Sequence, residues 1–139
     1  MDYLRESELK HGRIAMAATA GWVAVDLGLR VFPVPEGWAE LTPVTAHDAL
    51  VKTGSMGQLL LFFGLTEMLA YISLSQMLQG SGREAGNFGF DPLNLMGKLS
   101  EEKKKEMKLK ELTNGRAAML AFAGIVTQSV LYGKSFPYY

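Results

Sequence analysis

The chain has 139 residues, a formal net charge of zero from 14 basic and 14 acidic side chains, and no cysteine. The balanced charge excludes the basic excess of a nucleic-acid binder, and the lack of cysteine excludes disulfide frameworks, thiolate metal sites and cysteine nucleophiles. With only His11 and His47, a histidine-rich metal centre is excluded too. The 15 glycines and 48% hydrophobic content are unusual for a soluble helical domain, whereas small residues let membrane helices approach closely.

Three segments are predicted as long helices, at about residues 4–30, 56–78 and 101–132. The third begins with the charged run EEKKKEMKLKEL and turns apolar at Ala117. A short helix is expected over about 46–52, in a first connection that prolines interrupt. None of the three long segments contains about 18 apolar residues without a charge, so hydropathy alone gives marginal membrane spans. A soluble bundle with buried Ala- and Gly-rich helices is the alternative.

The charges of the two connections differ in sign. The first carries Glu36, Glu40 and Asp48 against Lys52, a sum of −2, whereas residues 80–110 carry seven basic and five acidic side chains, a sum of +2. If the helices span a membrane, this bias puts the second connection on the side that retains positive charge. Helices one and three would then run parallel, with the second helix running back between them.

An internal duplication links the first and third helices. Residues 8–23 (ELKHGRIAMAATAGWV) and 111–126 (ELTNGRAAMLAFAGIV) match at 10 of 16 positions at an offset of 103. Two equivalent helices imply a pseudo-twofold axis, and such pairs commonly meet at a shared interface. Small residues on both segments would permit a close crossing: Gly12, Ala15, Ala20 and Gly21, with Gly115, Ala118, Ala123 and Gly124.

Each copy carries a carboxylate and a guanidinium beside an apolar run, where an isolated charge costs at least a few kcal/mol. Within one copy the two charges are separated by about 140° around the helix, so a pair inside one helix is poorly placed. Twofold symmetry predicts an exchange instead, with Glu8 paired to Arg116 and Glu111 paired to Arg13. An arginine fork can hold a carboxylate in two hydrogen bonds away from water.

His11 and Asn114 follow the two glutamates three residues later, which puts them on a neighbouring face of each helix. A magnesium ion in a flat macrocycle with one open axial position accepts such nitrogen or oxygen ligands. A glutamate oxygen left over from an ion pair can do the same, because the arginine already balances its charge. The alternative is that both side chains form hydrogen bonds with a neighbouring helix.

The segments ESELKHGRIAM and KELTNGRAAM resemble the first and third membrane helices of the chlorophyll-binding light-harvesting complex family, and FGFDPLNL is similar to that family's FDPLGL loop. The resemblance covers nearly the whole chain and implies a single light-harvesting domain over residues 1–139. The implied fold is an all-α membrane protein with three transmembrane helices, the first and third crossed about a pseudo-twofold axis. The implied axial chlorophyll ligands are Glu8, His11, Glu111 and Asn114, with Arg13 and Arg116 as ion-pair partners.

The resemblance also implies further ligands. Gln128 is similar to a later ligand of helix three, and it lies within about 40° of the face of Asn114 and about 21 Å further along. Gln58 and Glu67 resemble the ligands of the middle helix, although a hydrogen bond to threonine or backbone would also satisfy Glu67. His47, in AHDALV, is similar to an extra pigment site of red-lineage chlorophyll a/c antennae, and a surface histidine is the alternative.

The family's carotenoids lie in the grooves of the crossed helices, and one end is expected at Phe88, Phe90, Asp91 and Pro92, with Trp22 and Phe122 as wall residues. The short middle connection is more similar to red-lineage antennae than to plant ones. The longer N-terminal region and the fourth short helix of plant members have no counterpart in this sequence. The resemblance therefore implies chlorophyll a, chlorophyll c and fucoxanthin, peridinin, diadinoxanthin or a similar carotenoid.

The implied function is a non-enzymatic antenna that absorbs light and transfers excitation energy to a photosystem, in the chloroplast thylakoid membrane with several passes. Its implied partners are the photosystem core, neighbouring antenna subunits and membrane lipids. A stress-type relative that binds pigment for quenching or photoprotection is the alternative. A di-iron carboxylate protein is a remote alternative, because the second copy has Glu-x-x-Asn where that site needs a second Glu-x-x-His. The charged start of helix three is expected to be a solvated extension at the membrane surface, or else a photosystem contact.

Overall fold

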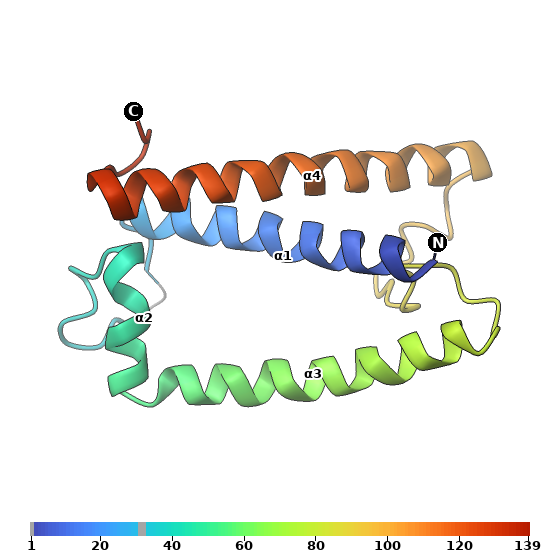
Figure 1. The fold of residues 1–139 in the computed structure, drawn as a ribbon, viewed down its shortest axis with the longest axis horizontal. Helices are drawn as coiled ribbons and strands as arrows, with labels where there is room; N and C mark the ends of the chain where they lie inside the picture. Colours follow the sequence, from blue (N-terminus) through green and yellow to red (C-terminus); the bar gives the residue numbers. More distant parts are fainter. Residues whose placement is uncertain (1, 31–32) are drawn as a thin grey trace. The chain divides into compact units, whose positions relative to one another are not determined.

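The computed structural model describes residues 2–30 and 33–139 and shows helices without any strand in those ranges. The helices are α1 (Asp2–Asp26), α2 (Pro43–Lys52), α3 (Ser55–Leu78) and α4 (Glu101–Tyr132) (Figure 1). The second and third long helices lie where the sequence predicted them. The prediction that the first helix reaches Arg30 is wrong, because α1 ends at Asp26, and the short helix begins three residues before its predicted start.

The end of α1 has a local cause. Gly28 adopts φ +79°, a left-handed conformation that glycine tolerates best. The N–H of Gly28 donates to Val25 and the N–H of Leu29 donates to Ala24, which is the hydrogen-bond pattern of a Schellman cap. The Arg30 guanidinium then donates to the Val25 carbonyl at 2.9 Å. These bonds satisfy carbonyl groups in the last turn of α1, and the helix ends there.

The first connection leads into α2 through a capping box. Thr42 accepts a hydrogen bond from the N–H of Thr45, and the Thr45 hydroxyl accepts one from the N–H of Thr42. Pro43 occupies the first turn, where its missing N–H costs nothing. Gly54, with φ +79°, then separates α2 from α3. The local sequence thus accounts for both ends of α2.

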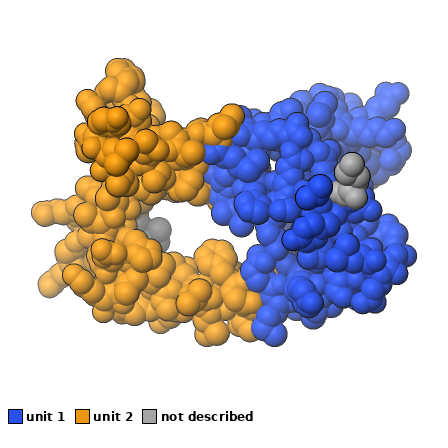
Figure 2. Space-filling model, viewed as in Figure 1, with its two compact units in different colours: residues 1–16, 67–119 blue, residues 17–66, 120–139 orange. Residues whose placement is uncertain are grey.

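The chain divides into two compact units, which Figure 2 colours separately. Unit 1 contains residues up to Met16 together with Glu67–Met119, and unit 2 contains Ala17–Thr66 together with Leu120–Tyr139. Unit 1 buries the apolar side chains Ala15, Met77 and Leu112, and unit 2 buries Ser129. Among the described residues no large side chain is completely buried, so contacts within the protein supply only a thin core.

Helix α3 presents apolar side chains on every face. Consecutive leucines and phenylalanines from Leu59 to Phe63 are each exposed, as are Leu65, Met68 and Leu69. Of the described helices, α3 alone is long and apolar enough to cross a membrane by composition, with a mean hydropathy of 1.4 and none of the tested window buried. A helix that is apolar all round and uncovered by protein requires an apolar surrounding.

Candidate functional site

The repeated segments of α1 and α4 meet in unit 1 at a pair of equivalent glycines. Gly12 and Gly115 are both buried, and a Cβ atom added to either would lie 3.0 Å from the Cα atom of the other. Ala15 and Leu112 are buried beside them. The expectation that Gly21 and Gly124 also permit the crossing is wrong, because an added Cβ at either meets nothing within 4 Å.

Two ion pairs join the same repeats, and they are the exchanged pairs that the duplication predicts. Arg13 Nε donates to Glu111 Oε1 at 2.6 Å, and Arg116 Nε donates to Glu8 Oε1 at 2.6 Å. Each carboxylate is therefore neutralised by the other helix. Since α1 and α4 each supply one acid and one base, the contact is reciprocal, as expected for a pseudo-twofold arrangement.

The two pairs differ in what surrounds them. Arg13 Nη1 also donates to the carbonyl of Gly86 at 2.9 Å, so the connection between α3 and α4 covers that pair. Glu8 instead receives a second cation from its own helix, because Arg5 Nη1 donates to Glu8 Oε2 at 3.1 Å. The Arg116 side chain is 56% exposed, compared with 37% for Arg13. The two ion pairs are therefore not equivalent, because the connection between α3 and α4 contacts only the pair of Arg13 and Glu111.

His11 and Asn114 lie at equivalent positions and are held in equivalent ways. The His11 Nδ1 atom is 2.8 Å from the carbonyl of Ser7, and Asn114 Nδ2 donates to the carbonyl of Lys110 at 2.8 Å. A carbonyl only accepts, so Nδ1 carries a proton, and in the neutral form of the imidazole Nε2 then has a free lone pair. Asn114 likewise keeps its Oδ1 oxygen available. Both side chains are exposed, and among residues 2–30 and 33–139 their hydrogen-bond partners lie in their own helix and not in a neighbouring one.

These observations test whether the residues fit a magnesium macrocycle. A second hydrogen bond that fixes the orientation and tautomer of a histidine is characteristic of metal-ligating histidines. Both residues are exposed on the surface of their helix, and each lies three residues after a charge-balanced carboxylate. His11 in the first repeat and Asn114 in the second therefore each fit as a ligand of a chlorophyll magnesium ion. By contrast, no cluster of three acidic or histidine side chains suited to a bare metal ion is found within residues 2–30 and 33–139.

The other predicted ligands lie on three elements. Gln128 is partly buried on α4 and Gln58 is exposed on α3, both within unit 2. His47 is exposed on α2, where its Nδ1 atom lies 3.1 Å from Asp48. Glu67 on α3 accepts a hydrogen bond from Lys10 of α1 at 2.7 Å, and within the described part of the chain it forms none with threonine or backbone. Nothing in the sequence spacing indicated that pair.

A second unpredicted feature is a buried ion pair between α1 and the connection from α3 to α4. Glu6 is 5% exposed, and its Oε2 atom lies 3.1 Å from Arg83 Nη2 and accepts a hydrogen bond from the N–H of Gly86. Arg83 also donates to the carbonyls of Ser73 and Asn87 and lies 5.0 Å from the centre of the Phe88 ring. The only sequence signal was the charge of each residue.

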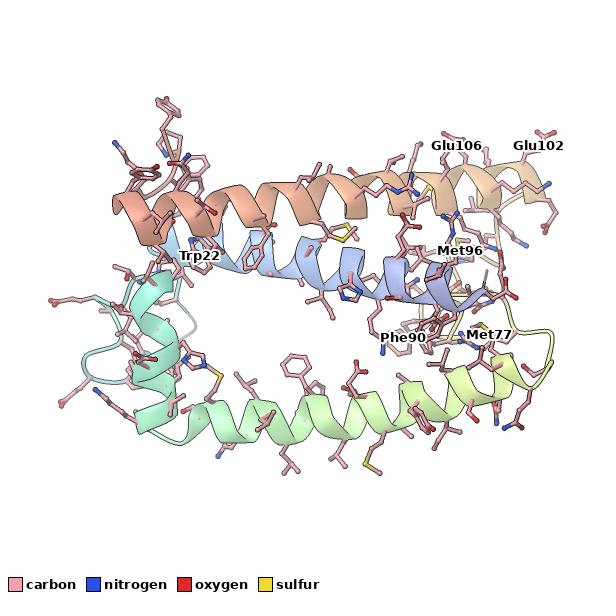
Figure 3. All side chains as sticks on the ribbon, viewed as in Figure 1. Trp22, Met77, Phe90, Met96, Glu102 and Glu106 are labelled. Carbon is pink, nitrogen blue, oxygen red and sulfur yellow. The ribbon has the colours of Figure 1, made fainter. Side chains whose placement is uncertain are left out.

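The loop after this pair contains the predicted carotenoid residues. Asp91 accepts hydrogen bonds from the N–H groups of Leu95 and Met96 at 2.9 and 2.8 Å, and these bonds hold the pKa of Asp91 below its usual range. Phe90 is 88% exposed. Phe88, Phe90 and Asp91 line an open cavity of about 1230 Å³ in unit 1, with Met77 and Met96 on its wall. Figure 3 labels Phe90, Met77 and Met96. In unit 2, Trp22 and Phe122 form an edge-to-face pair with ring centres 5.8 Å apart.

Comparison with known proteins covers almost the whole chain. A family model described as chlorophyll A-B binding protein matches residues 1–130. Light-harvesting complex stress-related protein 3.2 of Chlamydomonas reinhardtii is 37% identical over 136 residues, which cover 91% of this chain and 52% of that protein. A fucoxanthin-chlorophyll a-c binding protein of Chattonella marina var. antiqua is 34% identical over 138 residues, which cover 96% of this chain and 59% of that protein.

A second fucoxanthin-chlorophyll a-c binding protein, from Isochrysis galbana, is 33% identical over 141 residues, which cover 98% of this chain and 67% of that protein. The chain spans between half and two thirds of the length of these curated relatives. Because the family model and the relatives match the same repeats whose contacts are described above, this chain belongs to the chlorophyll a-b binding protein family.

Proposed function

We propose that the chain is a pigment-binding antenna protein that absorbs light and transfers excitation energy to a photosystem. The observation that carries the proposal is the repeated site of α1 and α4. In each copy an exchanged arginine balances a glutamate, and a histidine or asparagine three residues later presents a free nitrogen or oxygen atom. When bound, chlorophyll supplies the light absorption. The chain's own residues supply fixed distances and orientations between pigments.

Glu8, His11, Glu111 and Asn114 are the proposed axial ligands, and Gln128 is proposed for a further pigment on α4. The arginines act by neutralising the carboxylates, so that a glutamate oxygen can face an apolar ring without an uncompensated charge. Gln58, Glu67 and His47 are proposed for additional pigments, and all three are exposed on their helices. These three side chains therefore each have a side open to a macrocycle.

Three membrane spans are proposed, with α1 and α4 crossed about a pseudo-twofold axis and α3 running back between them as part of one light-harvesting domain. Support comes from the uncovered apolar surface of α3, the thin protein core and the pairing of charges on α1 and α4. Glu102 and Glu106 lie on the charged first turns of α4 (Figure 3) and are exposed. In the proposed arrangement these turns extend beyond the membrane. Washing membranes with alkaline carbonate should leave the chain in the pellet, and its release would contradict this part of the proposal.

The pigments are proposed to be chlorophyll a, chlorophyll c and a carotenoid such as fucoxanthin, because two of the relatives are named as fucoxanthin-chlorophyll a-c binding proteins. The cavity bordered by Phe88, Phe90 and Asp91 is large enough for one carotenoid end group. The proposed location is the chloroplast thylakoid membrane, and the proposed partners are a photosystem core and other antenna subunits. A chloroplast photosystem I chlorophyll a/b-binding protein of Arabidopsis thaliana, 35% identical over 143 residues, supports both.

A second function, quenching of excitation energy, is favoured by the similarity to stress-related light-harvesting proteins. The fluorescence lifetime of the purified pigment complex separates the two functions. A lifetime of several nanoseconds would support harvesting, and a strongly shortened lifetime would support quenching.

The absorption spectrum of the purified chain, followed by extraction and chromatography of its pigments, tests the proposal itself. Chlorophyll and carotenoid bands are expected together. A spectrum with carotenoid alone, or with iron bands, would contradict the antenna function.

A further inference from the structure

The middle helix carries one ion pair that the duplication does not explain. Lys10 Nζ of α1 donates to Glu67 Oε2 of α3 at 2.7 Å. The residue equivalent to Lys10 in the second repeat is Thr113, whose hydroxyl donates to the carbonyl of Leu109 within its own helix. The cation is therefore specific to α1, and it points to α3 and not to α4.

Glu67 lies near the middle of α3, where its neighbours are exposed apolar side chains such as Leu65, Met68 and Leu69. An unpaired carboxylate at the centre of a membrane helix costs at least a few kcal/mol and marks a functional position by default. The Lys10 ammonium contacts Oε2 only, and no donor among the described residues bonds to Oε1. The side chain is 59% exposed, so Oε1 remains accessible from outside the helix pair.

The pair of Lys10 and Glu67 resembles the arginine–glutamate pairs of the repeats. As at Glu111, a carboxylate on one helix is balanced by a cation from another helix, which contacts one of its two oxygen atoms. Glu8 differs, because Arg116 and Arg5 contact both of its oxygens. We propose that Lys10 is a positioning residue that balances the charge of Glu67 and orients it as an axial ligand for a chlorophyll between α1 and α3. This inference rests on the proposed antenna function. Lys10 itself does not touch the magnesium.

The experiment counts chlorophylls per polypeptide after the chain is refolded with chlorophyll a and carotenoid, with thermal stability as a second measurement. Lys10→Met and Glu67→Leu should each lose a single chlorophyll, and the double variant should lose no more than either alone. Glu67→Gln should keep that chlorophyll, because an amide oxygen can ligate magnesium without a counter-ion. For the same reason, Lys10→Met should lose nothing further when it is combined with Glu67→Gln.

Lys104→Met is the matched control, because Lys104 forms a similar pair with Glu101, 2.7 Å apart, on the charged turns of α4. It should leave the chlorophyll count unchanged. A full count in Glu67→Leu would overturn the inference, because Glu67 would then hold no pigment. Loss of the chlorophyll in Glu67→Gln alone, or in Lys10→Met with Glu67→Gln, would also overturn it. Either result would mean that the ion pair only holds α3 to α1 and does not balance the charge of a ligand.

The failure of this inference can be distinguished from failure of the proposed function. If the unaltered chain binds chlorophyll and His11→Leu removes some of it, the antenna function stands whatever the Glu67 variants show. If Lys10→Met does not refold, the combination with Glu67→Gln should restore refolding, and its failure to do so would contradict the charge-balancing role.

Discussion

A Cβ atom placed on Gly12 of α1 would lie 3.0 Å from the Cα atom of Gly115 on α4, and one placed on Gly115 would lie 3.0 Å from the Cα atom of Gly12. The neighbour in each case is backbone, which cannot move aside by a rotamer change. The crossing of the repeats in unit 1 therefore depends on the absence of both side chains. The reciprocal ion pairs flank this contact, so the glycines also set the distance across which the arginines reach.

Gly12→Ala should destabilise the chain by roughly 1–3 kcal/mol, the usual cost of overpacking. Gly21→Ala is the matched control, because Gly21 lies on the same helix with nothing within 4 Å of an added Cβ. There alanine should be neutral or stabilising by up to about 1 kcal/mol, since it is the better helix former. The midpoint of thermal unfolding measures both. Equal shifts for the two variants would show that the close contact is not important.

Arg13→Leu should reduce the yield of refolded complex more than Arg116→Leu. Arg13 holds both Glu111 and the carbonyl of Gly86, whereas the loss of Arg116 leaves Glu8 with Arg5. A double-mutant cycle on refolding yield should show strong coupling of Glu8 with Arg116 and near-additivity of Glu8 with Arg13. The reverse pattern of coupling would mean that the pairs close within each helix.

Gly86→Ala should loosen the connection between α3 and α4. Gly86 has φ +77°, and an added Cβ would lie 2.5 Å from the Leu9 Cδ1 atom. Gly82→Ala is the matched control, with φ +75° and open space. Both variants incur about 1–2 kcal/mol for the left-handed backbone, but only Gly86→Ala must also displace Leu9. Carotenoid content per polypeptide should fall in Gly86→Ala only, and a similar fall in both would implicate backbone conformation alone.

Asp91 should make the stability of the loop at residues 88–95 depend on pH in the acid range. Because the Leu95 and Met96 N–H groups lower the pKa of Asp91 in the folded chain, its contribution to stability is fully present above the ordinary aspartate pKa of about 3.9. This contribution is lost as the pH falls through the lower pKa that Asp91 has in the folded chain. The difference in thermal midpoint between the unaltered chain and Asp91→Asn should therefore be constant from neutral pH to about pH 5 and shrink below about pH 4. A difference that grows in acid would contradict this assignment.

The duplication explains why the central contacts could be predicted from the sequence. Two copies of one motif imply that each residue has an equivalent, so the partners of Glu8 and Glu111 followed from symmetry without any knowledge of the packing. The end of α1 could also have been predicted, because Gly28 follows the apolar run where a glycine cap is typical. The prediction that the helix reaches Arg30 is wrong because the glycine cap ends α1 first.

The contacts of the connection and of α3 could not be predicted in this way. Glu6 and Arg83 are 77 positions apart, and neither lies in a repeat or in a periodic pattern that relates the two. Lys10 and Glu67 are 57 positions apart on helices that share no motif. The sequence shows that a carboxylate in the middle of an apolar helix needs a partner, but only the structure shows that Lys10 of α1 is the cation beside it.

The central claim is that the two repeats hold chlorophyll through His11 and Asn114. It is tested most directly by counting chlorophylls in refolded His11→Leu and Asn114→Leu chains, with Thr113→Val as the control beside Asn114. Thr113 bonds to its own helix at 3.0 Å and should contribute nothing to pigment binding. The account predicts that each ligand variant, and Gln128→Leu as well, loses a single chlorophyll while Thr113→Val loses none. An unaltered chain without chlorophyll, or ligand variants with the full number, would contradict it.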